Sequence, residues 1–108
     1  MKTWFPSEAI SGLAQHVNAL IAAVVDGPAH TAARLRQSIC EGAPSDLRLV
    51  DYVEKVRNRS YRIAPSDIDV LRAAGFSDDA IFEITVAAAL GAGLHRLRCG
   101  LRALGVDG

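Results

Sequence analysis

The feature that most constrains the fold is a long apolar segment near the C-terminus. It starts after Phe76-Ser77-Asp78-Asp79, where Ser77 can cap a helix and two acids suit the positive end of the helix dipole. It can run as one helix over residues 78–104, before Gly105. The segment is apolar nearly all round, which is typical of a central helix that packs on several sides.

Small residues recur every four positions within this segment, from Ala87 to Gly93. Interior glycine costs about 0.5–1 kcal/mol relative to alanine. Its presence in a helix therefore indicates close backbone contact or a bend. We expect one or the other at Gly91, Gly93 and Gly100.

Glycine and proline divide the rest of the chain into four shorter helical segments, and no alternating strand pattern competes with them. We expect helices over residues 7–25, 28–40, 45–59 and 65–74, with Ser7 as the first N-cap and Gly75 as a C-cap glycine. Ile10, Leu13, Val17, Leu20, Ile21 and Val24 form one apolar stripe along the first of them. The sequence therefore predicts a single all-α domain of about five helices over residues 1–108.

The amino-acid composition excludes some classes of protein. Half of the chain is hydrophobic but only 6% is aromatic, so the core must be aliphatic and the chain is not disordered. Lys+Arg and Asp+Glu number 12 each, which argues against a nucleic-acid partner, and the basic stretch over residues 55–62 is interpreted as a solvated face. A neutral, alanine-rich chain has little charge to keep copies apart, so we expect self-association.

No targeting or membrane element is visible in the sequence. The longest uninterrupted apolar run, over residues 86–94, has nine residues, whereas a bilayer span needs about 18–20. We therefore expect no membrane partner and a cytoplasmic location.

The two cysteines, Cys40 and Cys99, form no C-x-x-C motif, and we expect both to be buried, reduced and inert. His95 and Cys99 are four residues apart and share a helix face, a spacing that could hold a metal or activate a thiolate. Two ligands are too few for a zinc site, so ordinary packing is the favoured interpretation and we expect no metal and no cofactor. The other two histidines, His16 and His30, are interpreted as surface or capping groups.

Glu83 is a candidate acid or base because it lies among apolar neighbours, where a carboxyl group can have a raised pKa. A structural ion pair is the favoured alternative. The candidate partners are Arg62, Arg72 and Arg96.

The stretch over residues 69–89 combines L-R-x-x-G, an S-D-D cap, I-x-E and an alanine-rich helix, and Gly93-Leu94-His95-Arg96-Leu97 follows it. This combination resembles the AhpD-like family, which includes alkylhydroperoxidase D and the carboxymuconolactone decarboxylases. The resemblance covers about the last 40 residues well and the rest only by helical pattern. It implies an AhpD-like helical domain that assembles into dimers, trimers or hexamers.

In the peroxidase branch of that family, the chemistry depends on a C-x-x-C motif with a histidine four residues on, just before the L-R-x-x-G helix. The corresponding residues 52–60 contain neither cysteine nor histidine. The peroxidatic and resolving thiols therefore cannot be transferred to this chain.

Three functions stay open. The first is an enzyme or binding protein for a small molecule between helices or subunits, with Glu83, His95, Arg96 or Cys99 as candidate catalytic residues. The second is a non-catalytic helical homo-oligomer that serves as a scaffold or binding module. The third is a single-thiol redox protein that uses Cys99 or Cys40.

Overall fold

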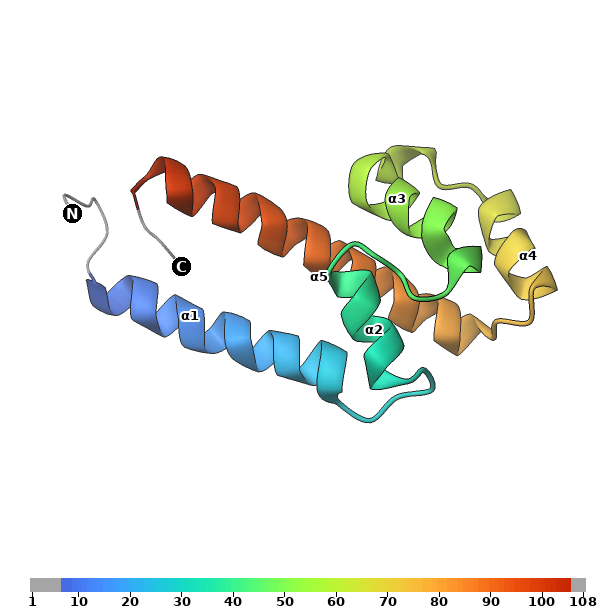
Figure 1. Cartoon of the computed structure of the whole chain (residues 1–108), viewed down its shortest axis with the longest axis horizontal. Coiled ribbons are helices and arrows are strands. Elements are labelled where there is room, and N and C mark those ends of the chain that lie inside the picture. Colours follow the sequence, from blue (N-terminus) through green and yellow to red (C-terminus); the bar gives the residue numbers. More distant parts are fainter. Residues whose placement is uncertain (1–6, 106–108) are drawn as a thin grey trace.

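The computed structural model describes the backbone of residues 7–105 and the side chains of residues 12–105. Over this range the chain is all α, without strands, which confirms the predicted fold class (Figure 1). The five α-helices are α1 (Ser7–Ile21), α2 (Ala33–Cys40), α3 (Val50–Asn58), α4 (Pro65–Ala73) and α5 (Asp78–Ala103). The side chain of Ser7, predicted as an N-cap, lies outside the described residues.

Helix boundaries depart from the prediction where side chains compete for the backbone. α1 ends in a π-helical turn, Ala22–Asp26, instead of continuing as a regular helix to residue 25. α2 begins at Ala33 and not at residue 28, because the backbone just before it bonds to a side chain of α5. A 3₁₀ turn, Leu47–Leu49, precedes α3, with the Asp46 carboxylate accepting a bond from the Arg48 amide.

The core forms around the N-terminal half of α5, against α2, α3 and α4. Ile84, Ala87 and Ala88 of α5 are fully buried, and Ile39 of α2 and Leu49 before α3 are buried with them. Alanine at two of these positions lets the neighbouring helices approach closely. The prediction of a central helix is therefore confirmed for this half of α5.

Only one of the three interior glycines of α5 is explained by close contact. At Gly91 a Cβ atom would collide with the carbonyl oxygen of Cys40, at the C-terminal end of α2, and would lie 2.6 Å from Nη1 of Arg57. At Gly93 and Gly100 a Cβ atom would meet nothing within 4 Å. Close backbone contact is therefore confirmed at Gly91, whereas at the other two glycines no such contact exists within the described chain and the alternative expectation of a bend stays a prediction.

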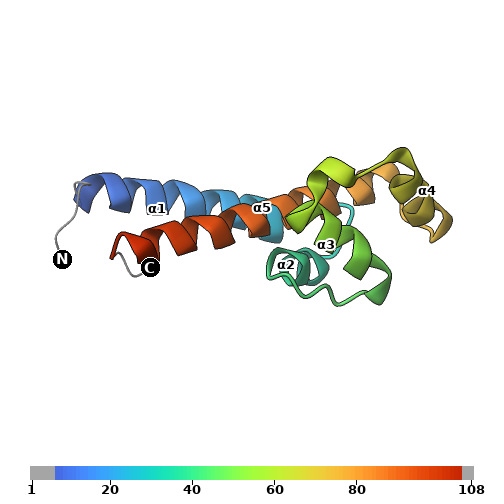
Figure 2. The same cartoon turned by 90° about the horizontal axis from the view of Figure 1, so that it is seen from above.

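The molecule is elongated. α1 and the C-terminal half of α5 extend together away from the other helices (Figures 1 and 2). The principal extents are 52 × 29 × 20 Å and the radius of gyration is 15.8 Å, against about 13 Å for a compact chain of this length. We call residues 12–24 and 90–104 the arm.

Arg36 joins the arm to the rest of the molecule. This side chain is 4% exposed, and its guanidinium donates to the carbonyl oxygens of Val24 at 2.7 Å and Gly27 at 2.8 Å. These carbonyls lie at the C-terminal end of the first helical segment, where the helix dipole favours a positive charge. Carbonyl groups that a helix end leaves without partners thus offset part of the cost of burying Arg36, whose Nε has no hydrogen-bond partner within the described chain.

Candidate functional site

Glu83 is a structural anchor on α5. Its carboxylate accepts bonds from the backbone N–H of His30 at 2.9 Å, the backbone N–H of Thr31 at 2.8 Å and the Thr31 hydroxyl at 2.7 Å. Nδ1 of His30 lies 3.1 Å from the same carboxylate. Glu83 thereby holds the segment before α2 against α5.

The surroundings of Glu83 contradict the candidate acid or base, and they fit the favoured structural pairing except that the partners are His30 and Thr31 and not an arginine. Burial alone would raise the pKa of Glu83, but the hydrogen bonds from His30 and Thr31 outweigh it and lower the pKa to about 2. The expected raised pKa is therefore wrong, since apolar neighbours in sequence do not exclude polar neighbours in space. A carboxylate this acidic is ionised at neutral pH and is poorly suited to general acid or base catalysis.

The expected arginine partner of Glu83 is also wrong. Arg72 pairs with Asp78 at 2.8 Å and Asp69 at 3.3 Å. Arg96 donates to the carbonyl oxygen of Arg57 at 2.7 Å and so caps the C-terminal end of α3. Arg62 forms no ion pair within the described chain.

His95 and Cys99 are adjacent on the exposed surface of α5. The Cys99 Sγ lies 3.8 Å from Nε2 of His95 and 3.4 Å from Nη2 of Arg102. Cys99 is exposed and unbridged, so the expectation that both thiols are buried is wrong for this one. α5 continues beyond the core, so Cys99, which would pack against neighbouring helices in a compact bundle, faces solvent.

Cys40 is half-buried and unbridged at the end of α2. Burial raises the pKa of the Cys40 thiol above its usual value, although the positive charges of Arg57 and Arg98 oppose this effect. A raised pKa leaves little thiolate at neutral pH. Cys40 is thus half-buried where burial was expected, and its inertness stays a prediction.

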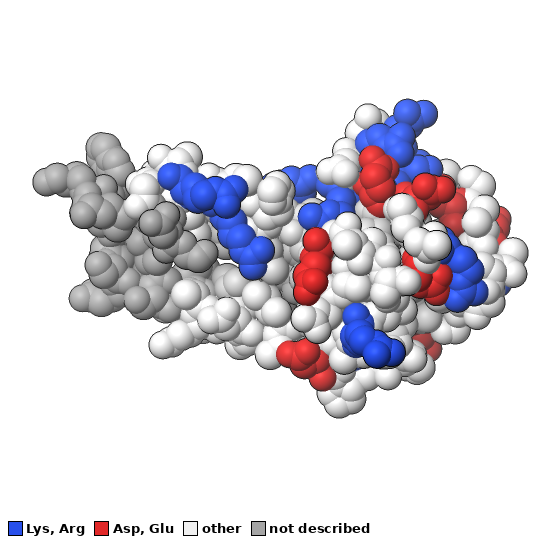
Figure 3. Space-filling view, in the orientation of Figure 1, with Lys and Arg blue, Asp and Glu red and all other residues white. Residues whose placement is uncertain are grey.

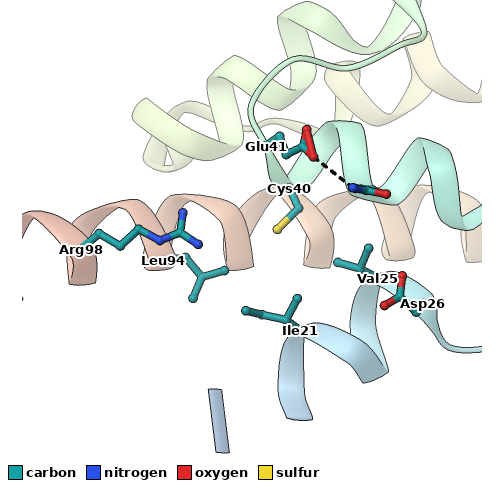
Figure 4. A pocket seen from close by; sticks show the side chains of 8 residues that line it. Ile21, Val25, Asp26, Cys40, Glu41, Leu94 and Arg98 are labelled. Atoms are coloured by element: carbon teal, nitrogen blue, oxygen red, sulfur yellow. Dashed lines mark hydrogen bonds between the residues drawn. The ribbon is translucent and has the colours of Figure 1, made fainter. Parts of the chain in front are cut away.

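A cavity of about 260 Å³ lies at the base of the arm, between the π-helical turn, α2 and α5 (Figure 4). The Cys40 side chain points into it toward Leu94 and Ile21. Charged groups surround these apolar walls. The lining residues are Ile21, Val25, Asp26, Gln37, Cys40, Glu41, Leu94 and Arg98. None of the candidate catalytic residues Glu83, His95, Arg96 and Cys99 lines this cavity.

Most charged side chains on the shorter helices form ion pairs within the described chain. In the basic stretch predicted as a solvated face, Lys55 pairs with Asp67 at 2.8 Å and Arg59 with Glu54 at 2.7 Å. Figure 3 shows positive and negative side chains intermixed there, whereas positive side chains lie along the C-terminal half of α5. In sequence, residues 91–103 of α5 contain three arginines and no acid.

The arm carries a heptad pattern, of which the sequence had shown only the α1 part, as an apolar stripe. In α5, leucines occur at alternating intervals of four and three residues: Leu90, Leu94, Leu97, Leu101 and Leu104. α1 and its π-helical turn repeat the spacing with Leu13, Val17, Leu20 and Val24. This is the heptad spacing of a and d positions, which places apolar side chains along one seam for another helix to cover. A search of the sequence for apolar residues at heptad spacing would have found this pattern.

Part of this pattern is uncovered: three of the nine side chains are exposed, five are half-buried and Leu94 is buried. Leu13 is 50% exposed, Leu20 is 51% exposed and Leu104 is 42% exposed. Among the described side chains, none in α1 is buried, and none in α5 is buried beyond Leu94. We use the name seam for these nine arm residues from here on.

Comparisons with known proteins identify no relative of this chain. No protein-family model matches the chain, and searches of curated proteins and of solved structures each found no match. Among the described residues, no group of three or more His, Cys, Asp or Glu side chains could hold a metal ion. By length and composition alone α5 could cross a membrane, a test that an apolar core helix also passes.

Proposed function

We propose that this chain is a non-catalytic helical module that forms a homodimer through its arm and so serves as a scaffold or binding unit. The observation that carries the proposal is the exposed seam. In the arm, α1 and the C-terminal half of α5 lie side by side, and their heptad-spaced apolar side chains are partly exposed. An exposed apolar patch on a protein in water marks an interaction surface.

A second copy of the chain is the occupant that we favour. In a twofold dimer the same patch meets itself, so a seam of regular leucine and valine residues is its own complement. Residues 7–33 contain no lysine or arginine, whereas residues 91–103 contain three arginines. A pair in which α1 packs on the partner's α5 would therefore place the basic helix beside one without positive charge.

The size of the arm fits a modest dimer. Fifteen residues of helix are about 22 Å long and two helices side by side are about 20 Å wide. The footprint is then roughly 450 Å², and its accessible area is larger because side chains interdigitate. The footprint itself lies below the range of about 600–1,000 Å² per partner that specific interfaces bury, which is typical of a weak or transient complex. We expect a dimer that dissociates on dilution.

Lysine at an exposed seam position tests this proposal. Leu20→Lys places a charge in the centre of the interface, and Val70→Lys is the matched control on α4, where the valine is 66% exposed and lies outside the arm. Light scattering should give a dimer for the parent and for Val70→Lys but a monomer for Leu20→Lys, with the same helical circular dichroism. A parent that stays monomeric, or that instead floats with anionic vesicles, would contradict the proposal.

The cavity at the base of the arm supports a second candidate function, the binding of a small molecule with an apolar body and a carboxylate. Apolar walls from Ile21, Val25 and Leu94 suit the body, and Arg98, which forms no ion pair within the described chain, suits the carboxylate. Octanoate should raise the melting temperature of the parent and not of Arg98→Gln. Equal shifts, or none, would remove this candidate.

Membership of the AhpD-like family and a cytoplasmic location both stay predictions. The motif stretch over residues 69–89 is what supports the former.

A further inference from the structure

We propose that the cavity at the base of the arm is a regulatory site for the dimer: a small apolar carboxylate bound there fixes α1 beside α5 and strengthens the pairing of two copies. The inference rests on the proposed function and names the regulation of the same seam. The cavity lies where the last turn of α1, the π-helical turn, α2 and α5 meet (Figure 4).

Both helices of the arm contribute apolar side chains to the cavity. Ile21 is the last residue of α1, and Leu94 of α5 is itself a member of the seam. Cys40 points toward both of them from the end of α2, and Gln37 lines the cavity from the same helix. A ligand in the cavity would therefore contact both helices of the arm and α2 at once.

The placement of α1 depends mainly on its C-terminal end. None of its described side chains is buried, and its main link to the rest of the molecule is the π-helical turn, which packs on α2 and α5. Val25 of that turn is buried, and the Arg36 guanidinium holds the carbonyl oxygens of Val24 and Gly27. A group that packs against this turn therefore acts on the position of the whole of α1.

A ligand would favour the arrangement of α1 and α5 that the seam requires. Side chains that line a cavity lack packing partners on that side and lose dispersion contacts. An apolar chain between Ile21, Val25 and Leu94 supplies these contacts only while α1 and α5 keep their positions. Because such a ligand binds one arrangement of the arm better than any other, it shifts the population toward that arrangement.

The size and charge of the cavity indicate the ligand class. Its volume of about 260 Å³ is just below the range of about 300–1,000 Å³ that is typical of ligand pockets, so a short chain fits. Arg98, which forms no ion pair within the described chain, suits a carboxylate. Asp26 and Glu41 also line the cavity and disfavour a second negative group. Octanoate, with one carboxylate, is therefore the matched probe.

The expected coupling follows from linkage. If octanoate strengthens the dimer, the dimer must bind octanoate more tightly than the monomer does, and such coupling is typically about 5–150-fold. A dimer carries two cavities, so fivefold tighter binding in each would lower the dissociation constant of the dimer by about 25-fold. We expect a decrease of at least this size when octanoate is saturating.

Sedimentation equilibrium of the parent chain, with and without saturating octanoate, measures this decrease. Cys40→Leu fills the cavity from its own wall, so it should strengthen the dimer without octanoate and lose the response to octanoate. Cys99→Leu is the matched control, because it makes the same substitution at the exposed thiol outside the cavity. Its dimer should respond to octanoate like the parent, and circular dichroism checks that both variants stay helical.

The results separate this inference from the proposed function. A parent that is monomeric with and without octanoate overturns both. A parent dimer whose dissociation constant octanoate leaves unchanged or raises overturns this inference alone, as does a Cys40→Leu dimer that keeps the full response. In the monomeric Leu20→Lys variant, octanoate should slow amide exchange over residues 12–24, and unchanged exchange there would also overturn the inference.

Discussion

Replacing Gly91 by alanine tests the contact on which the packing of α2 against α5 depends. The new Cβ would lie 2.6 Å from Nη1 of Arg57, 2.8 Å from the carbonyl carbon of Cys40 and closer still to its oxygen, whereas ordinary contacts are 3.4–4 Å. The arginine can move, but the backbone at the end of α2 would have to shift by roughly 1 Å. Overpacking of this kind costs about 1–3 kcal/mol.

The helical preference of alanine opposes this cost and recovers about 0.5–1 kcal/mol. We therefore expect Gly91→Ala to lower the free energy of unfolding by about 0–2.5 kcal/mol, with a central value of about 1 kcal/mol. Gly93→Ala is the matched control two residues along the same helix, where a Cβ meets nothing within 4 Å. It should raise the free energy of unfolding by about 0.5–1 kcal/mol.

Urea unfolding followed by circular dichroism, at low protein concentration, measures both variants. The two substitutions are chemically identical, so opposite signs would isolate the contact with Cys40. If Gly91→Ala is as stable as Gly93→Ala, which gains the same helical preference without a clash, the close approach of α2 to α5 is refuted.

Three further predictions concern Glu83, Arg36 and the thiols. The folded pKa of Glu83 is about 2, below its usual 4.5, so its contribution to stability is present above pH 4.5 and is lost as the pH falls toward 2. Glu83→Gln should lower the free energy of unfolding at pH 7 by about 1–2 kcal/mol and flatten its fall in acid, by urea titration at several pH values. Arg36→Met should leave the Val24 and Gly27 carbonyls without donors and cost about 1–3 kcal/mol, with faster amide exchange in α1. A thiol reagent should label exposed Cys99 faster than half-buried Cys40; equal rates would contradict the burial of Cys40.

Local signals were enough to predict the helices but not all of their ends. Ser77 caps α5 as its sequence predicts, with the Ser77 hydroxyl accepting from the Ala80 amide at 3.1 Å, and Gly75 has the positive φ of a C-cap glycine. The start of α2 could not be predicted, because Glu83, more than 50 residues away in sequence, binds the backbone before it. Long-range side-chain bonds of this kind leave no local pattern.

The candidate site was harder to predict than the fold. The i, i+4 spacing of His95 and Cys99 correctly placed them side by side, but not their exposure, because nothing in the spacing shows where the core ends. For Glu83, apolar sequence neighbours indicated burial and a raised pKa, whereas the partners that lower it come from another segment. The seam could be predicted from the sequence, because its apolar residues repeat with a period of seven residues.

The central claim is that a second copy covers the arm, and sedimentation equilibrium of the parent chain tests it most directly. Over about a hundredfold range of concentration, the weight-average mass should rise toward twice the 11.5 kDa of one chain, and Leu20→Lys should stay at the mass of one chain. A parent mass of 11.5 kDa at every concentration would contradict the account.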